Sequence, residues 1–234
     1  MSQGGFSIPV VPEAEAAQRI LEQKAERESV RRREVRAECA KVLDQLPRAF
    51  QYPANELLTR PKLDPLLRSK VNALTTPTLS AFLLGPSGVG KTTMAAVLVK
   101  RALAEYAQSL GERCQEVAGL KWIDAPELSL CDRRHPLGDG RPAPLAEACN
   151  ARSLVIDDIG LEQNQGPLLE VLRFRYNQLL PTITTSGLTK QQLTGQISGA
   201  GVRRLREQHA GYPVLVVDVH PPIEKAGGKS QSKA

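Results

Sequence analysis

Short, uninterrupted runs of apolar residues recur along the chain. Three of them lie at 82–84, 154–156 and 214–217, with the sequences Phe-Leu-Leu, Leu-Val-Ile and Val-Leu-Val-Val. Strands of a parallel sheet are buried on both faces, so their sequences are apolar at consecutive positions. These runs therefore predict buried parallel strands. The strands expected from the pattern span 79–84, 121–124, 153–158, 181–185 and 214–218.

Between these runs the apolar residues recur every three or four positions, which is the spacing of a helix. Strands that alternate with helices predict an α/β fold, a parallel sheet with helices on both faces in three layers. Two stretches rich in Pro and Gly, 47–66 and 132–144, predict an irregular connector and an exposed loop. The expected helices span 66–74, 91–109, 167–179, 190–197 and 202–208.

A long polar segment precedes the predicted sheet. Residues 13–46 contain no Gly or Pro, and charges of both signs alternate along them, so they predict one extended helix. Its apolar residues Val35, Cys39, Val42 and Leu46 form one narrow stripe at helical spacing. Such a helix is either solvated with a short anchoring end or an arm that binds a partner, and the pattern leaves both open.

Composition narrows the class of protein. The chain has 234 residues, of which 41% are hydrophobic, enough for one sizeable domain with an appendage. Aromatic residues make up only 4%, which argues against the stacking platforms that bind single-stranded nucleic acid. The net charge of +6 favours an encounter with nucleic acid or an acidic partner. The four cysteines are irregularly spaced and do not indicate a zinc site.

The sequence lacks the two segments that would direct it out of the cytoplasm, a signal peptide and a membrane span. The first residues lack a basic segment followed by an apolar run, so no signal peptide is expected. No apolar stretch approaches the roughly 20 residues of a membrane span. The sequence therefore predicts a cytoplasmic protein with no membrane partner.

A glycine-rich loop directly follows the first predicted strand and opens the helix at 91–109. It matches G-x-x-x-x-G-K-[ST], a pattern in which glycines let backbone N–H groups wrap a phosphate. Lys91 is expected to neutralise phosphate charge, and the Thr92 hydroxyl to bind Mg²⁺, with Thr93 as a second hydroxyl. The residues expected to bind ATP are Gly85, Pro86, Ser87, Gly88, Val89, Gly90, Lys91, Thr92 and Thr93.

The predicted strand at 153–158 ends in two carboxylates. In proteins with this phosphate loop, the first acid after the apolar strand holds Mg²⁺, and Asp157 occupies that position. The next acid is placed to polarise the attacking water. Many ATPases have Glu there, whereas this chain has Asp158, which is one methylene shorter. Glu162 is a weaker alternative for the base.

Three segments together resemble a known family. They are 79–93, 154–160, which contains Asp-Asp-Ile-Gly, and 175–189, which contains Arg-Tyr and then Pro-Thr-Ile-Thr-Thr-Ser. The chain resembles the DnaC/IstB-like AAA+ ATPases over residues 47–219. That family comprises replicative helicase loaders and transposition helper ATPases. The resemblance implies a P-loop NTPase fold of the AAA+ type, with no helical lid domain after Asp218.

The resemblance also implies two further functional positions. A sensor residue that contacts the γ-phosphate or the attacking water is expected on the fourth strand. The family often has Ser-Asn-Leu there, but this chain has Ser-Gly-Leu at 186–188, so Thr185 or Ser186 is expected to serve. An arginine that completes the neighbouring subunit's site is also expected, and Arg203 and Arg204 are the candidates.

These observations predict three regions: a lead and partner-binding helix at 1–46, an ATPase domain at 47–220, and a disordered basic tail at 221–234. The expected function is that of an ATPase that hydrolyses ATP slowly, faster on assembly or on DNA. We expect a nucleotide-dependent homo-oligomer that contacts the backbone of single-stranded DNA and a replicative helicase or transposase. The alternatives are an interaction module with little hydrolysis and a P-loop small-molecule kinase, for which Arg133, Arg134 and Arg141 supply lid candidates.

Overall fold

The computed structural model describes residues 13–76, 78–109, 117, 119–135, 140–207 and 214–221. Five strands in these ranges form one sheet in the order β2-β3-β4-β1-β5, and every pair of neighbours is parallel. The strands are β1 (Ala81–Leu84), β2 (Leu120–Asp124), β3 (Ser153–Asp157), β4 (Thr182–Ser186) and β5 (Leu215–Asp218). Each of the five strands expected from the sequence is present.

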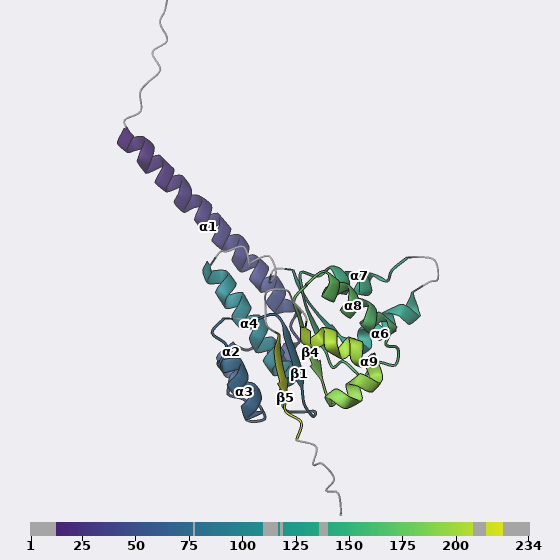
Figure 1. The fold of residues 1–234 in the computed structure, drawn as a ribbon. Helices are drawn as coiled ribbons and strands as arrows, with labels where there is room; N and C mark the ends of the chain where they lie inside the picture. The colour runs from purple at the N-terminus through teal and green to yellow at the C-terminus, as the bar shows by residue number, and fades with distance from the viewer. Residues whose placement is uncertain are drawn as a thin grey trace, which may run out of the picture.

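Helices cover both faces of the sheet (Figure 1). Those before or just after β1 are α1 (Glu13–Gln45), the 3-10 helix η1 (Arg48–Phe50), α2 (Ala54–Leu58), α3 (Pro65–Asn72) and α4 (Lys91–Ser109). Those that follow β2 are α6 (Ala125–Arg134), α7 (Ala143–Asn150), α8 (Gly166–Asn177) and α9 (Lys190–Glu207). The first group lies on one face of the sheet, and the second group lies on the other.

The alternation of side chains along the strands divides the core into two layers. Ala81 and Leu83 of β1 pack with helices α1 to α4. Phe82 and Leu84 of the same strand pack with helices α6 to α9. The predicted three-layer α/β fold is therefore confirmed, with the sheet buried between two helical layers. Because helices cover both faces of the sheet, a ligand can reach the sheet only at the ends of its strands.

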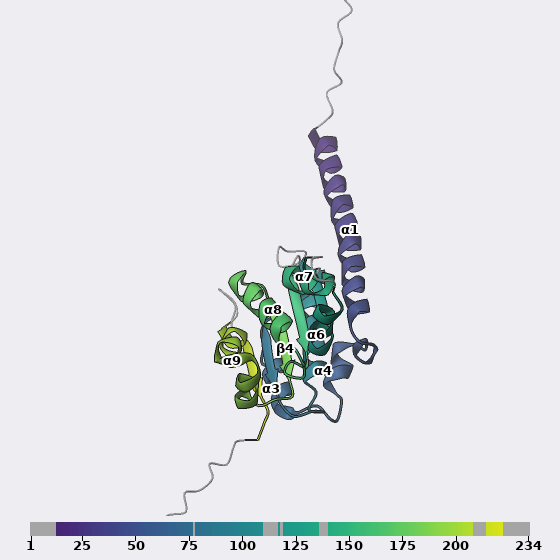
Figure 2. The ribbon, with the colours of Figure 1, turned by 90° about the vertical axis from the view of Figure 1, so that its right-hand side faces the viewer.

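The predicted N-terminal helix is present as α1. Its last part belongs to the core, since Val35, Val42 and Leu46 are buried and Cys39 is half-buried. The Tyr106 hydroxyl of α4 also donates a hydrogen bond of 2.5 Å to the Glu38 carboxylate. The described side chains between 17 and 34 are exposed, and this part of the helix extends away from the rest of the molecule (Figures 1 and 2).

The predicted exposed loop at 132–144 is wrong at both ends. Helix α6 continues to Arg134, and α7 begins at Ala143. Two of the prolines that indicated a loop lie at the start of α7, where Pro142 is the N-cap and Pro144 occupies the first turn. Proline is tolerated there because the first N–H groups of a helix have no intrahelical acceptor. Residues 136–139 lie outside the described residues.

Helix α9 contains a break that the sequence predicted in part. The two expected helices at 190–197 and 202–208 correspond to one element interrupted at Ser198, whose φ of 67° and ψ of 161° are non-helical. The glycines around the break have low helix propensity, so little helical stability is lost there. The Ser198 hydroxyl accepts the Gly201 N–H at 3.4 Å and so caps the second half of the helix.

Several expectations fall outside the described residues. They concern the lead at 1–12, the end of α4 at Gly111, Cys114 and the tail from 222 onward. The expected lack of a lid domain after Asp218 stays a prediction. Within the ranges that the structure covers, none of the helices has both the length and the apolar character that crossing a membrane requires.

Candidate functional site

The glycine-rich loop lies at the carboxyl edge of the sheet, between β1 and α4. Ligands of open α/β sheets bind at this edge, where parallel strands end and helices begin. The backbones of both neighbouring strands hold the start of the loop. The Gly85 N–H donates to the Ser186 carbonyl of β4 at 3.2 Å, and the Val219 N–H after β5 donates to the Leu84 carbonyl at 3.0 Å.

Two glycines give this loop its shape. Gly88 and Gly90 have φ values of 85° and 93°, a region that residues with a Cβ rarely adopt. A Cβ at Gly90 would also lie 2.6 Å from Cδ1 of Leu63, whereas the space beside Gly88 is open. The segment before α3 supports the loop, since the Asp64 N–H donates to the Val89 carbonyl at 3.0 Å. Contacts within the chain therefore support this conformation of the loop.

Lys91, the first residue of α4, is buried with 6% of its surface exposed. Its Nζ donates to the carbonyl of Pro86 at 2.9 Å, so the ammonium group points back into the loop. Burial lowers the pKa of Lys91, and the negative charges of Asp158 and Asp157 oppose that shift. A buried ammonium group whose acceptor is a backbone carbonyl is suited to an anion that offers stronger acceptors.

Asp157 ends β3 beside the first turn of α4. Its Oδ1 accepts the Thr92 hydroxyl at 3.1 Å and also the hydroxyl of Thr185 from β4. The pKa of Asp157 is raised, mainly by burial. The hydrogen bonds from Thr185 and Thr92 oppose this shift, and the negative charge of Asp158 adds to it. The structure thus brings together three residues predicted from separate parts of the sequence.

Asp158 adopts a backbone conformation that is uncommon for a residue with a side chain. Its φ is 56°, and its N–H donates to the Thr185 hydroxyl at 2.9 Å. The following residue is also held by β4, since the Ile159 N–H donates to the Thr185 carbonyl at 2.9 Å. Left-handed conformations of this kind persist where surrounding contacts impose them, and they are frequent at functional sites.

Two other candidates form hydrogen bonds that hold the backbone. The Ser186 hydroxyl donates to the Ile159 carbonyl at 2.7 Å and accepts the Leu188 N–H at 3.1 Å. The buried Glu162 carboxylate accepts the Gly160 N–H at 2.6 Å, and burial raises its pKa. These contacts connect the turn after β3 with the segment after β4. Of the two predicted sensor residues, Thr185 is the one whose hydroxyl contacts the acidic strand end.

The two candidate arginines lie in the second half of α9. The Arg203 side chain is 64% exposed, and its Nε lies 3.7 Å from a carboxylate oxygen of Glu207. Arg203 lines a groove between α9 and the edge strand β5, together with Lys190, Arg206 and Val216. No residue of the glycine-rich loop lines this groove among the residues that the structure describes. The groove is therefore separate from the loop of the same chain.

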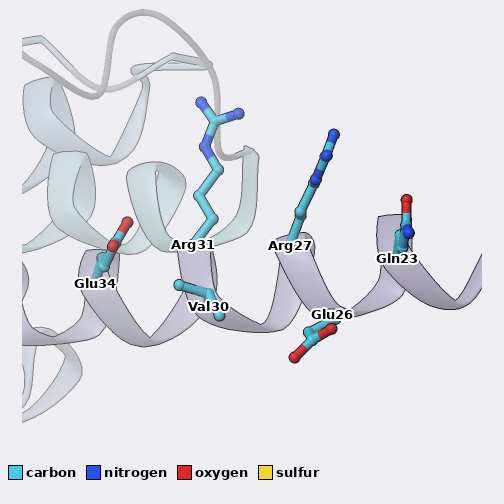
Figure 3. Close-up of a pocket in the computed structure, with 6 residues that line it drawn as sticks. All are labelled: Gln23, Glu26, Arg27, Val30, Arg31 and Glu34. Atoms are coloured by element: carbon cyan, nitrogen blue, oxygen red, sulfur yellow. The ribbon is translucent and has the colours of Figure 1, made fainter.

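A second hollow lies along the projecting part of α1 (Figure 3). Every described residue that lines it belongs to α1. Arg27 and Arg31 point to one side of the helix, and Glu26 points to the other (Figure 3). The described residues that line it are Gln23, Glu26, Arg27, Val30, Arg31 and Glu34.

Sequence reasoning missed two residues at the carboxyl edge. Asp124 ends β2 in register with Asp157, and its charge contributes to the raised pKa of Asp157. The signal was available, since Trp122-Ile123-Asp124 is another strand that ends in an acid. His220 follows β5, and its imidazole lies 2.8 Å from Asp218 and 3.2 Å from the Gly187 carbonyl. No sequence pattern distinguishes His220.

Comparisons with known proteins were made for both sequence and structure. No family model and no curated protein sequence matches the chain. Among solved structures, DnaI matches with 19% identity and a TM-score of 0.45, covering 70% of this chain and 94% of DnaI. The DnaC helicase loader matches with 23% identity and a TM-score of 0.44, covering 65% of this chain and 86% of its own.

A third match is AMPPCP-bound DnaA from Aquifex aeolicus, with 19% identity and a TM-score of 0.41, covering 66% of this chain and 45% of DnaA. These superpositions are modest, so the fold is assigned from the strand order and from the loop between β1 and α4. The chain is similar in structure to DnaI, DnaC and DnaA at these modest TM-scores.

Proposed function

We propose that the chain binds ATP with Mg²⁺ at Gly85–Thr92 and Asp157, and that it hydrolyses ATP slowly. One observation carries this proposal. The Lys91 ammonium group points back into the glycine-rich loop, while Thr92 and Asp157 place two oxygens 3.1 Å apart beside it. Backbone N–H groups at the start of α4 add the positive end of the helix dipole.

The residues present fit both ligands. Phosphate oxygens are stronger acceptors for Lys91 than the Pro86 carbonyl that it contacts in the structure. Mg²⁺ is usually bound by one or two protein oxygens together with phosphates and waters, and Thr92 and Asp157 supply such a pair. When bound, Mg²⁺ would neutralise charge on the phosphates. The buried Asp157 would then gain a cation partner that offsets its desolvation.

Asp158 is the residue that we propose as the base for hydrolysis. Its negative charge acts to raise the pKa of both Lys91 and Asp157. Its backbone N–H donates to the Thr185 hydroxyl. Thr185 is the proposed sensor because it joins the two acids to β4. An aspartate reaches less far than the glutamate common at this position, and position 187 carries no side chain, so slow turnover is expected.

The wider function that we propose follows the resemblance of the sequence motifs. The chain would act as a helicase loader or transposition helper, assembling on DNA with a helicase or transposase as partner. The projecting part of α1 supports an arm of this kind, since Ile20 and Leu21 are 53% and 66% exposed there. Residues 1–46, 47–220 and 221–234 would then be the arm, the ATPase domain and a basic tail.

The alternatives differ in how the structure bears on them. An interaction module with little hydrolysis is favoured by Ser186, whose hydroxyl is already engaged with Ile159 and Leu188. A small-molecule kinase is not favoured. Arg141, one of its candidate lid arginines, lies 2.5 Å from Glu170 of α8, in an ion pair between surface elements.

Nucleotide binding and turnover by two variants test the proposal. Lys91→Ala should abolish measurable binding of ATP, whereas Lys100→Ala on the same helix should leave binding unchanged. Asp158→Asn should bind ATP as the wild type does but turn it over about a hundredfold more slowly, the scale of losing a general base. Retained affinity in Lys91→Ala would overturn the site. Unchanged turnover in Asp158→Asn would overturn only the base.

A further inference from the structure

His220 lies where the last strand passes the glycine-rich loop. In the sheet β1 lies between β4 and β5, and Leu84 of β1 is in register with Asp218 of β5. The Val219 side chain occupies the space beside Gly85, since a Cβ at Gly85 would lie 2.3 Å from Cγ2 of Val219. The next residue, His220, is therefore at the carboxyl edge, directly after a contact with the loop.

The imidazole of His220 connects two strand ends across β1. Its Nδ1 lies 2.8 Å from Oδ1 of Asp218, and the same oxygen accepts the His220 backbone N–H at 3.0 Å. Its Nε2 lies 3.2 Å from the carbonyl oxygen of Gly187, the residue after β4. Both facing oxygens can only accept, so each contact is a hydrogen bond when the ring nitrogen facing it carries a hydrogen, and the imidazolium form donates to both at once. The His220 side chain is 13% exposed, whereas its partner Asp218 is 42% exposed.

Gly187 is a residue that needs such a tether. It has no side chain, and no atom lies within 4 Å of the position that a Cβ would occupy. Glycine also has the greatest backbone freedom of any residue. The two residues before it are Ser186, whose carbonyl accepts the Gly85 N–H, and Thr185, whose hydroxyl contacts Asp157. A shift at Gly187 would thus be transmitted both to the loop and to the acid.

We propose that His220, oriented by Asp218, is a positioning residue that fixes the backbone at Gly187 and so aligns the end of β4 with the glycine-rich loop. The proposal rests on the proposed function, because it concerns how the site responds to nucleotide. In the proposed function the loop would hold both nucleotides, and the terminal phosphate of ATP would make an additional demand on the residues around Thr185 and Asp157. His220 therefore increases the affinity for a nucleoside triphosphate relative to a diphosphate.

The test compares the dissociation constants of AMPPCP and ADP in the presence of Mg²⁺. His220→Ala should weaken AMPPCP binding about two- to tenfold relative to ADP, the range for losing one hydrogen bond. His220→Gln places an amide donor near the same carbonyl and should recover most of the difference. His135→Ala, at the other histidine in the described ranges, should leave the ratio unchanged. Amides 187–189 should also exchange hydrogen faster in His220→Ala.

The outcomes separate this inference from the proposed function. Equal weakening of both nucleotides, an unchanged ratio, or a glutamine variant no better than alanine would overturn the role of His220. The exchange measurement needs no nucleotide, and unchanged exchange at 187–189 would overturn the tether itself. If the wild-type protein binds neither nucleotide, the proposed function fails, and the effect on nucleotide preference fails with it.

Discussion

Asp157 shows how a single residue is held ready for a cation. Two hydroxyls donate to one of its oxygens, but burial and two neighbouring carboxylates, those of Asp158 and Asp124, raise its pKa. The charged form is therefore disfavoured in the protein without ligand. A cation that binds there would remove this penalty, so binding and deprotonation are coupled.

The raised pKa of Asp157 predicts a dependence on pH with a definite sign. The folded protein binds this proton more tightly than the unfolded chain does. Asp157 therefore stabilises the fold at pH values below its pKa in the unfolded chain. That stabilisation is lost as the pH rises through the folded pKa. Binding of Mg²⁺ and nucleotide should strengthen over the same interval, because the carboxylate is the ligand.

Asp157→Asn isolates this effect. The variant should melt at the same temperature as the wild type or higher, with the difference growing as the pH rises, since it carries no buried charge. It should also lose Mg²⁺-dependent nucleotide binding. Thermal melting of both proteins from about pH 4, near the ordinary pKa of an aspartate, to about pH 8 checks the first point. A variant less stable at every pH would contradict the argument.

At the scale of elements, the buried side chain of Arg175 connects two parts of the fold. It is fully buried in α8, and its guanidinium donates to the Thr182 hydroxyl at 2.8 Å. It also donates to the carbonyls of Ala148, Cys149, Ala151 and Pro181. Burial lowers the pKa of Arg175 to about 9, which still leaves it charged at neutral pH. This side chain joins the end of α7 to the start of β4.

Arg175→Met should therefore destabilise the fold rather than alter chemistry. The change leaves several buried carbonyls without donors, and we expect a loss of about 3–5 kcal/mol. Arg173→Met, at an exposed position on the same helix, is the matched control and should change stability by less than about 0.5 kcal/mol. Urea unfolding measures both. Comparable stability of the two variants would show that the buried guanidinium is dispensable.

At the scale of the whole molecule, two surfaces extend beyond the proposed nucleotide site. One is the projecting part of α1, and the other is the groove that contains Arg203 between α9 and β5. Both surfaces present exposed side chains that can contact another molecule rather than the hydrophobic core. We propose that assembly uses them, with Arg203 or Arg204 of one subunit approaching the nucleotide of the next.

Assembly is tested by measuring mass and turnover together. We expect a larger mass in ATP than in ADP, and a higher rate with single-stranded DNA that falls as salt is added. Arg203→Ala or Arg204→Ala should lower the rate of the assembled protein at least about tenfold, a modest share of what an arginine finger supplies. Nucleotide affinity of the single subunit should not change. A monomer that is indifferent to DNA in both nucleotides would contradict the loader or helper function.

What could be predicted from the sequence was encoded in contiguous patterns. The apolar runs predicted three of the five strands, and the strands at 121–124 and 181–185 were also expected from the sequence. The glycine-rich motif predicted a loop whose backbone the structure shows. The helices on either side of 136–139 were missed, because prolines at helix starts resemble prolines in loops. The site roles of Lys91 and Asp157 stay predictions that the geometry supports.

By itself, the sequence determined the strands, the phosphate-loop motif and the acidic strand end, because each depends on residues adjacent in the chain. Only the tertiary structure decided that Thr185 meets Asp157 and that His220 reaches Gly187. Those contacts join residues about thirty positions apart, and strand order and register select them. Local periodicity determines which face of an element is buried. Which strand ends become neighbours follows from how the whole sheet packs between its two layers of helices.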